Sequence, residues 1–115
     1  MASPTLDFDL AAEIEALHAE PDWQTGQNAK TLAKYDDLRI VLTALAAGKR
    51  LAGHRTRARV SIHTVSGLIR VHVDSNTFEL GPGRVLVLDR DLQHEVEAMA
   101  DSAFLLTMTW SGART

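Results

Sequence analysis

The sequence predicts an all-β domain, a barrel or jelly roll, preceded by one short α-helix. From residue 38 onward, short apolar or alternating runs are separated by turn residues, a pattern typical of antiparallel strands. The connections between the runs are too short for the crossover helices that join parallel strands. Without helices to cover them, the strands must close or form two facing sheets, which hides the edges and buries one face of each sheet.

The first expected element is an amphipathic helix over about residues 8–19. Apolar residues recur there at helical spacing between capping residues: Leu10, Ile14 and Leu17, with Asp7 or Asp9 before them and Pro21 after them. His18 lies beside these residues on the helix, where a packed or boundary histidine is expected in preference to a ligand-binding one. Residues 22–37 show no sustained period and are expected to form a loop or an edge segment leading into the sheet.

The remaining elements are seven strands with tight turns between them. The strands are expected at 38–46, 58–65, 68–73, 77–80, 84–88, 94–98 and 103–110. The turn residues between them are Gly48, Gly53, Gly67, Asp74 to Asn76, Gly81 to Gly83, and Asp89 to Asp91. Gly and Asn tolerate a positive φ and Asp bonds its own main chain, so these residues suit turns. The expected organisation is a helix and lead-in segment at 1–37, a barrel at 38–110 and a tail at 111–115.

Composition narrows the functional classes. The chain has 115 residues, the size of one domain, and its 12 Lys and Arg against 15 Asp and Glu give a net charge of -3. No basic excess is present to offset nucleic-acid phosphates, so we expect no nucleic-acid partner. No apolar run approaches a bilayer span and no basic, apolar leader opens the chain, so we expect a cytoplasmic protein without a membrane partner. The absence of cysteine excludes disulfides and thiolate chemistry.

The spacing of Gly48, His54, Thr56, Val60 and Gly67 resembles that of the first motif of the cupin superfamily. That motif has a glycine, five residues, H-x-H, three or four residues, a glutamate, six residues and a glycine. In this chain the register falls on Gly48, His54, Thr56, Val60 and Gly67. The spacing is kept, while Thr56 and Val60 replace the second histidine and the glutamate.

A second stretch follows the second cupin motif. Its glycine, five residues, P-x-G, two residues, histidine, three residues and asparagine fall on Gly83, Asp89, Asp91, His94 and Ala98. The chain therefore resembles the small single-domain, RmlC-like cupins of the cupin 2 type. The resemblance implies a double-stranded β-helix, the cupin jelly-roll barrel, and a homodimer, since cupin domains commonly pair.

The resemblance also implies a reduced metal site. Cupins use the two motif-one histidines, the glutamate and the motif-two histidine as ligands, and only His54 and His94 remain here. Strand alternation places Thr56, Ala58, Val60 and Ile62 on the face of His54, and Val96 and Ala98 on the face of His94. No carboxylate shares that face, whereas two-histidine iron sites and catalytic zinc sites need a third protein ligand.

Several interpretations of this site remain open. His54, Thr56 and His94 are the candidate ligand-binding residues, and His54 and His94 are the candidate ligands of a divalent Fe, Mn, Ni or Zn ion. A third metal ligand would have to come from another strand, from the turn at Asp89 and Asp91, from a bulge that breaks the alternation, or from a substrate. Otherwise both histidines are polar residues of a pocket, hydrogen-bonded and neutral. No cofactor is established and no catalytic residue is identified.

Three functions follow from these interpretations. The first is binding of a small organic molecule in a largely apolar barrel, with His54, Thr56 and His94 fixing its orientation. The second is a metal-dependent oxygenase or isomerase, completed by a ligand outside the motifs. The third is a non-catalytic dimeric interaction module whose barrel is filled by side chains. Whether the protein is an enzyme stays open.

Overall fold

The computed structural model describes residues 4–111, and of Gly53 and His54 it describes only the main chain. One α-helix and one 3-10 helix precede the strands. The elements in chain order are α1 (Leu10–Ala19), η1 (Pro21–Thr25), β1 (Gln27–Lys34), β2 (Leu38–Leu45), β3 (Arg50–His54), β4 (Arg59–Ser66), β5 (Ile69–Val73), β6 (Asn76–Leu80), β7 (Val85–Leu88), β8 (His94–Ala98) and β9 (Ser102–Thr109).

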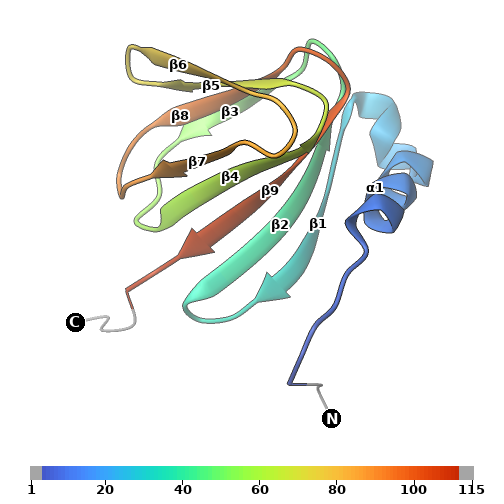
Figure 1. Cartoon of the computed structure of the whole chain (residues 1–115), viewed down its shortest axis with the longest axis horizontal. Helices are drawn as coiled ribbons and strands as arrows, with labels where there is room; N and C mark the ends of the chain where they lie inside the picture. Colours follow the sequence, from blue (N-terminus) through green and yellow to red (C-terminus); the bar gives the residue numbers. More distant parts are fainter. Residues whose placement is uncertain (1–3, 112–115) are drawn as a thin grey trace.

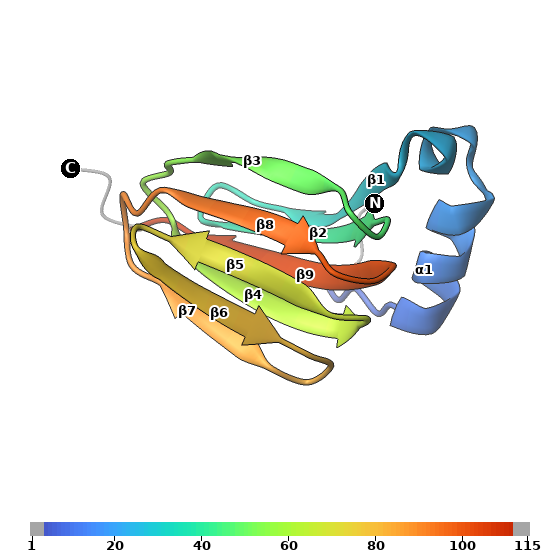
Figure 2. The ribbon, with the colours of Figure 1, turned by 90° about the horizontal axis from the view of Figure 1, so that it is seen from above.

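The strands form two antiparallel sheets that face each other. Sheet A has the order β1-β2-β9-β4-β7, and sheet B has the order β3-β8-β5-β6. The chain passes from one sheet to the other at every connection between strands except β1–β2 and β5–β6, so neither sheet is a simple meander. Figures 1 and 2 show the two layers, with sheet B lying over β9 and β4 of sheet A. This is the all-β jelly-roll barrel that the sequence predicts.

An apolar core fills the space between the sheets. Alternate residues of each strand point inward, and their side chains pack across the two layers. The buried members are Leu45, Val60, Ile62, Ile69, Val71, Val73, Leu80, Leu88, Val96, Ala98 and Phe104. Leu51, Leu86, Leu92, Leu106 and Met108 are partly buried against them.

A second, smaller core lies outside the barrel, between α1 and sheet A. Leu17 is buried against Leu32, Leu42 and Ala44, and partly buried apolar side chains of the helix join them. The helix begins at the N-cap Asp9, whose carboxylate accepts a hydrogen bond from the main-chain amide of Ala12 at 3.2 Å. Figure 1 shows α1 beside β1, away from the space between the sheets.

All seven expected strands are present within a residue or two of their expected bounds, and the expected helix is α1. His18 is exposed and stacks on Trp23, with ring centroids 4.3 Å apart. β3 is not among the expected strands, and β1 lies within residues 22–37, where a loop or an edge segment leading into the sheet was expected. β1 is an edge strand, which extends sheet A ahead of Leu38, where the prediction starts the barrel. Its sequence does not alternate, so its strand conformation follows from pairing with β2.

No helix among residues 4–111 is long and apolar enough to cross a membrane. Compartment stays a prediction.

Candidate functional site

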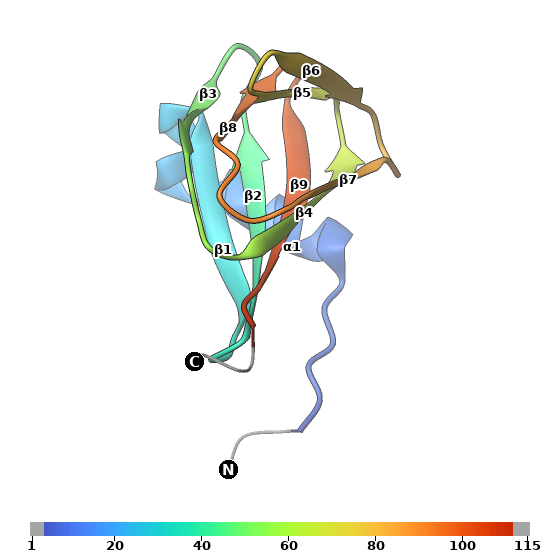
Figure 3. The same cartoon turned by 90° about the vertical axis from the view of Figure 1, so that its left-hand side faces the viewer.

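Three connections meet at one end of the barrel, which we call the loop end. They are the β3–β4 connection (residues 55–58), the β5–β6 turn (residues 74–75) and the β7–β8 connection (residues 89–93). The main-chain amide of Asp91 donates to the carbonyl of Thr56 at 2.9 Å, which ties two of these connections together. Figure 3 looks toward this end, where the two connections lie side by side. Both halves of the motif pattern therefore meet here.

Asp91 occupies the position at which the second cupin motif has its last glycine. Its φ is +64°, in the left-handed region that glycine adopts freely and that Asp tolerates better than most residues. The turn therefore has a conformation that glycine favours, with Asp91 in the position of the motif glycine. Since the amide of Asp91 bonds Thr56, this conformation also fixes the distance between the two motifs.

A β-bulge brings the main chains of His54 and His94 opposite each other. On β3, Leu51 pairs with Val96 and His54 pairs with His94, so β3 has one residue more than β8 between these pairs. Such a bulge resets the alternation of faces along the strand. A bulge was one of the expected ways of altering the ligand set. The side chain of His54 lies outside the described residues.

His94 is the described histidine that belongs to the barrel interior. Its side chain shares the inward face of β8 with Val96 and Ala98, and the residue is 8% exposed. Its ring Nδ1 lies 3.3 Å from the main-chain oxygen of Leu92. In the neutral ring, donation from Nδ1 to that carbonyl leaves the lone pair on Nε2, the tautomer that an acceptor or metal ligand needs.

Thr56 lies in the β3–β4 connection and is half-buried. Its Oγ1 accepts a hydrogen bond from the amide of Ala58 at 3.1 Å. The expected alternation from residue 54 through residue 62 as one strand is wrong, because the chain leaves sheet B after His54 and enters sheet A at Arg59. From Ala58 onward the expectation is confirmed, since Ala58, Val60 and Ile62 are buried.

Val60 stands where the cupin motif has its glutamate. It is 3% exposed and belongs to the apolar core between the sheets.

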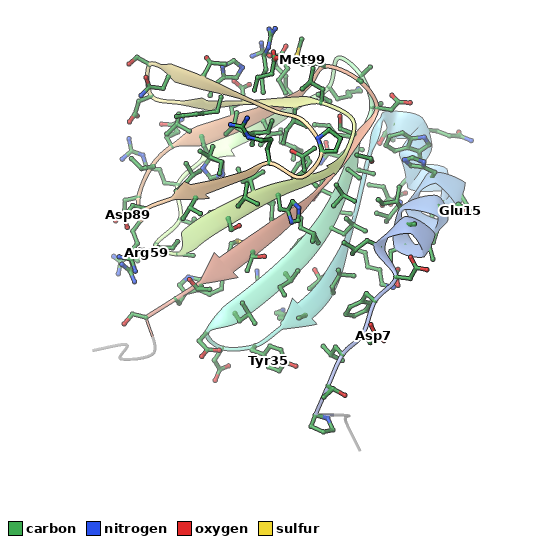
Figure 4. All side chains as sticks on the ribbon, in the orientation of Figure 1. Asp7, Glu15, Tyr35, Arg59, Asp89 and Met99 are labelled. Atoms are coloured by element: carbon green, nitrogen blue, oxygen red, sulfur yellow. The ribbon has the colours of Figure 1, made fainter. Side chains whose placement is uncertain are left out.

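Asp89 lies in the turn that was a possible source of a third metal ligand, and it forms an ion pair with Arg59 at 3.1 Å. Figure 4 shows both side chains at the outer rim of the barrel. The amide of Arg90 and the guanidinium of Arg59 lower the pKa of Asp89.

Comparison with solved structures shows how far this architecture is shared. A conserved protein of unknown function from Streptococcus pyogenes matches with a TM-score of 0.78 and 22% identity over 96% of this chain and 91% of that one. A cupin superfamily protein from Desulfitobacterium hafniense matches with a TM-score of 0.72 and 18% identity over 74% and 78% of the two chains. The chain has a cupin-type fold. No protein-family model and no curated protein matches the sequence.

A larger enzyme contains a similar domain. Salicylate 1,2-dioxygenase from Pseudoaminobacter salicylatoxidans matches with a TM-score of 0.78 and 14% identity, over 89% of this chain and 34% of that one. The chain therefore spans about a third of that enzyme. The cupin fold is shared among uncharacterised proteins and dioxygenases, so the fold itself does not select a reaction.

The described side chains do not form a metal site with three protein ligands. Within residues 4–111, apart from the side chains of 53 and 54, no group of three His, Asp or Glu could hold an ion. Glu95 and Glu97 alternate with the inward residues of β8 and lie on the outer face of sheet B. These two carboxylates thus stand outside the barrel, and no step of a metal-dependent reaction can be derived from them.

Arg39 is an interior residue that the sequence analysis missed. It pairs with Met108 across β2 and β9, and Met108 pairs with the core residue Val60, so all three lie in one inward row of sheet A. Its Nε is buried without a hydrogen-bond partner. Its guanidinium carbon lies 5.7 Å from the ring centroid of Trp110. The signal in the sequence was its even spacing from Leu45 along β2.

The outer face of sheet B carries a network of charges. Arg50 lies 3.3 Å from Glu95 and 3.4 Å from Glu97, and His72 Nε2 lies 3.1 Å from Glu97. The other ring nitrogen of His72 is 3.1 Å from the hydroxyl of Thr77. The His72 hydrogen bond, together with Arg50, lowers the pKa of Glu97, and both glutamates raise the pKa of Arg50. Both ring nitrogens of His72 therefore contact side chains on the outer face of sheet B, Thr77 and Glu97.

A depression of about 380 Å³ lies near the loop end, lined by Ala52, His72, Asp74, Gln93, His94 and Glu95. His72 and Glu95 form a cross-strand pair on the outer face of sheet B. The depression therefore opens on the outer side of this sheet and reaches the barrel interior only at His94. It does not contain the inward row of Arg39.

Proposed function

We propose that this protein binds a small organic molecule at the loop end of its barrel, where His94, Thr56 and His54 fix the orientation of the ligand. The observation that carries the proposal is His94, a buried imidazole on the inward face of β8. An imidazole in an otherwise apolar wall is costly unless it is hydrogen-bonded. Binding sites of this kind are apolar cavities with a few placed polar groups.

The tautomer of His94 decides how this residue would meet a ligand. Nδ1 lies 3.3 Å from the carbonyl oxygen of Leu92, which can only accept, so in the neutral ring the lone pair is on Nε2. In the proposed complex a hydroxyl or amine of the ligand donates to Nε2. Thr56 adds a hydroxyl group whose oxygen accepts from the amide of Ala58 and whose O–H can donate to a ligand.

The alternative of a metal-dependent cupin enzyme requires a donor beyond the two histidines. The pairing of His54 with His94 supplies two candidate ligands on neighbouring strands. Val60, at the position of the third, is part of the apolar core. A divalent Fe, Mn, Ni or Zn ion would therefore need a coordinating group from the ligand itself, and the metal arm of the experiment below addresses this case.

The alternative of a dimeric interaction module rests on the edge strand β7. Val85 and Val87 are 51% and 66% exposed on the outer face of this strand, and exposed apolar residues at a sheet edge favour pairing with another surface. The homodimer stays a prediction. A monomeric mass by light scattering at micromolar concentration would count against it.

The experiment is a thermal-shift screen of small metabolites, with and without divalent Fe, Mn, Ni and Zn. Wild-type protein is compared with His94→Gln, His54→Gln and Thr56→Ala. Compounds that raise the melting temperature of the wild type are expected to lose at least about tenfold in affinity with His94→Gln, since a buried hydrogen bond to the ligand is lost.

The matched control is His63→Gln. His63 lies on β4, where it pairs with Val85 of β7 and is on the outer face of sheet A. Its replacement therefore leaves the interior unchanged. A screen without a hit, or hits that bind all the histidine variants equally well, would overturn the proposed function. Stoichiometric metal in the purified protein, lost in both His54→Gln and His94→Gln, would instead establish the metal-dependent alternative.

A further inference from the structure

The charges of the chain are divided between its N-terminal segment and the rest. Residues 5–29 contain six of the 15 Asp and Glu and no Lys or Arg, whereas the remaining residues contain nine Asp and Glu and all 12 Lys and Arg. The net charge of -3 therefore combines -6 in the segment that contains α1 and η1 with +3 in the rest of the chain. Surfaces of opposite charge attract and orient binding partners.

The loop end is rich in arginine. Four arginines lie in or next to its β3–β4 and β7–β8 connections, and we call them the arginine rim: Arg55, Arg57, Arg59 and Arg90. Arg59 pairs with Asp89. Arg55 and Arg57 are exposed, and no ion pair among residues 4–111 includes either of them. The hydrogen bond between the two connections holds the rim together.

The acidic segment lies at the opposite end of the molecule. Figures 1 and 2 share the longest axis, and both show α1 at one end of it and the loop end at the other. The exposed acids of the segment are Asp7, Asp9, Glu15, Glu20 and Asp22. Within one copy the acidic segment and the arginine rim are too far apart to meet. Their complementary charges can therefore come together only between copies.

The exposed face of α1 also has a shape that fits an arginine side chain. A shallow hollow of about 360 Å³ is lined by Ala12, Glu15, Ala16 and Ala19, which lie on one face because they are three or four residues apart. The aliphatic part of an arginine packs on apolar surface of this kind, while its guanidinium binds a carboxylate. No ion pair among residues 4–111 includes Glu15.

We propose that copies of this chain associate head to tail, with the arginine rim of one copy on the exposed face of α1 of the next. Arg55 or Arg57 occupies the hollow between the alanines and pairs with Glu15. Because the two surfaces differ, every dimer keeps one unused rim and one unused helix, so association continues into a ring or a chain. This interface lies outside the barrel interior, and the inference does not rest on the proposed function.

The first measurement is sedimentation velocity of the full chain at about 10 µM to about 1 mM, in about 20 mM and about 500 mM NaCl. At low salt the average mass should rise with concentration and pass the mass of a dimer. At high salt it should return to the mass of one chain, because exposed ion pairs contribute little each and are screened.

Two variants each remove one of the surfaces. The rim variant carries Arg55→Gln and Arg57→Gln, and the helix variant carries Glu15→Lys. Each should lose at least about tenfold in the association constant at low salt. The matched control carries Arg70→Gln and Arg84→Gln, which remove the same charge from β5 and from the β6–β7 connection, away from the loop end. The control should associate as the wild type does.

A mixture of the rim variant and the helix variant tests the head-to-tail arrangement directly. The rim variant keeps an intact helix, and the helix variant keeps an intact rim. The mixture should form a heterodimer and nothing larger, because the two surfaces left over in that heterodimer are both altered. Melting temperatures within about 2 °C of the wild type at high salt show that both variants are folded.

Several results would overturn the inference. The wild type stays monomeric at low salt up to about 1 mM, the mixture stays monomeric, or the rim variant associates as the wild type does. A dimer that persists at high salt and in both variants also contradicts it, and points to the apolar edge strand β7 instead. The proposed function is tested separately, since the metabolite screen can be run at high salt, where head-to-tail contacts are screened.

Discussion

The side-chain amide of Asn28 donates to the main-chain carbonyl of Leu17 at 2.9 Å and to Glu20 at 2.7 Å. Asn28 lies on β1, and Leu17 lies in the last turn of α1, where carbonyl groups lack a partner within the helix. A buried residue of the sheet thus completes the hydrogen bonding of the helix end. This contact fixes the helix on sheet A beside the smaller core.

Replacing Asn28 by Ala should lower the free energy of unfolding by about 1–3 kcal/mol, because the carbonyl of Leu17 would be left buried without a donor. Chemical denaturation monitored by circular dichroism measures the change. Lys30→Ala is the control, since its 2.7 Å ion pair with Glu13 joins the same two elements at the surface and should contribute at most about 1 kcal/mol. Equal losses in both variants would contradict the role given to Asn28.

Gly67, the last residue of the first motif, is required for a close approach as well as for its conformation. Its φ is +83°, and a Cβ there would overlap the Oγ of Ser102 and the main-chain oxygen of Asp101. The hydroxyl of Ser102 accepts from the amide of Leu68 at 3.0 Å. Ser102 therefore cannot move away without losing this hydrogen bond.

Gly67→Ala should cost about 1–2 kcal/mol for the left-handed backbone and about 1–3 kcal/mol more for the overlap. Gly48, the first residue of the same motif, is the matched control: its φ is +86°, and no atom lies within 4 Å of the position that a Cβ would take there. Gly48→Ala should show the backbone cost alone. Denaturant midpoints of the two variants measure the difference, and similar midpoints would argue against the steric contribution.

The carboxylate of Glu97 should contribute to stability in a way that depends on pH. Its pKa is lowered by the hydrogen bond from His72 and by Arg50. A lowered folded-state pKa means that the contribution is complete above the unfolded pKa of about 4.3 and is lost as the pH falls through the folded value. Glu97→Gln should therefore be less stable than the wild type at pH 7, and the difference should vanish in acid.

Melting temperatures of the wild type and Glu97→Gln between pH 7 and pH 3 provide the measurement. Glu15→Gln is the control, because Glu15 is exposed on the face of α1 that points away from the sheet (Figure 4). A constant difference between wild type and Glu97→Gln across this range would contradict the assignment of the effect to the ionised carboxylate.

Much of the fold can be predicted from the sequence because it depends on local patterns. The alternation in residues 94–98 places Val96 and Ala98 inside and Glu95 and Glu97 outside, as the structure has them. Turn residues such as Gly48 and Gly67 mark the places where the backbone has a positive φ. The same alternation puts His94 on the face of Val96 and Ala98, and all three residues are buried.

Other features could not be predicted because they depend on partners distant in the chain. β1 lacks a strand pattern and becomes a strand by pairing with β2. The bulge that sets His54 opposite His94 follows from the register between β3 and β8. Arg39 carries no motif, and only the pairing of β2 with β9 shows that it lies in the same inward row as Val60.

The sequence by itself determined that the chain forms short antiparallel strands around an apolar interior and that the motif positions lack a carboxylate, since residue type and spacing set both. Only the tertiary structure decided which charge enters that interior. The reason is physical: a side chain acquires its surroundings from strands that pair across the sheet. The inward position of Arg39 therefore came to light only once sheet A was assembled.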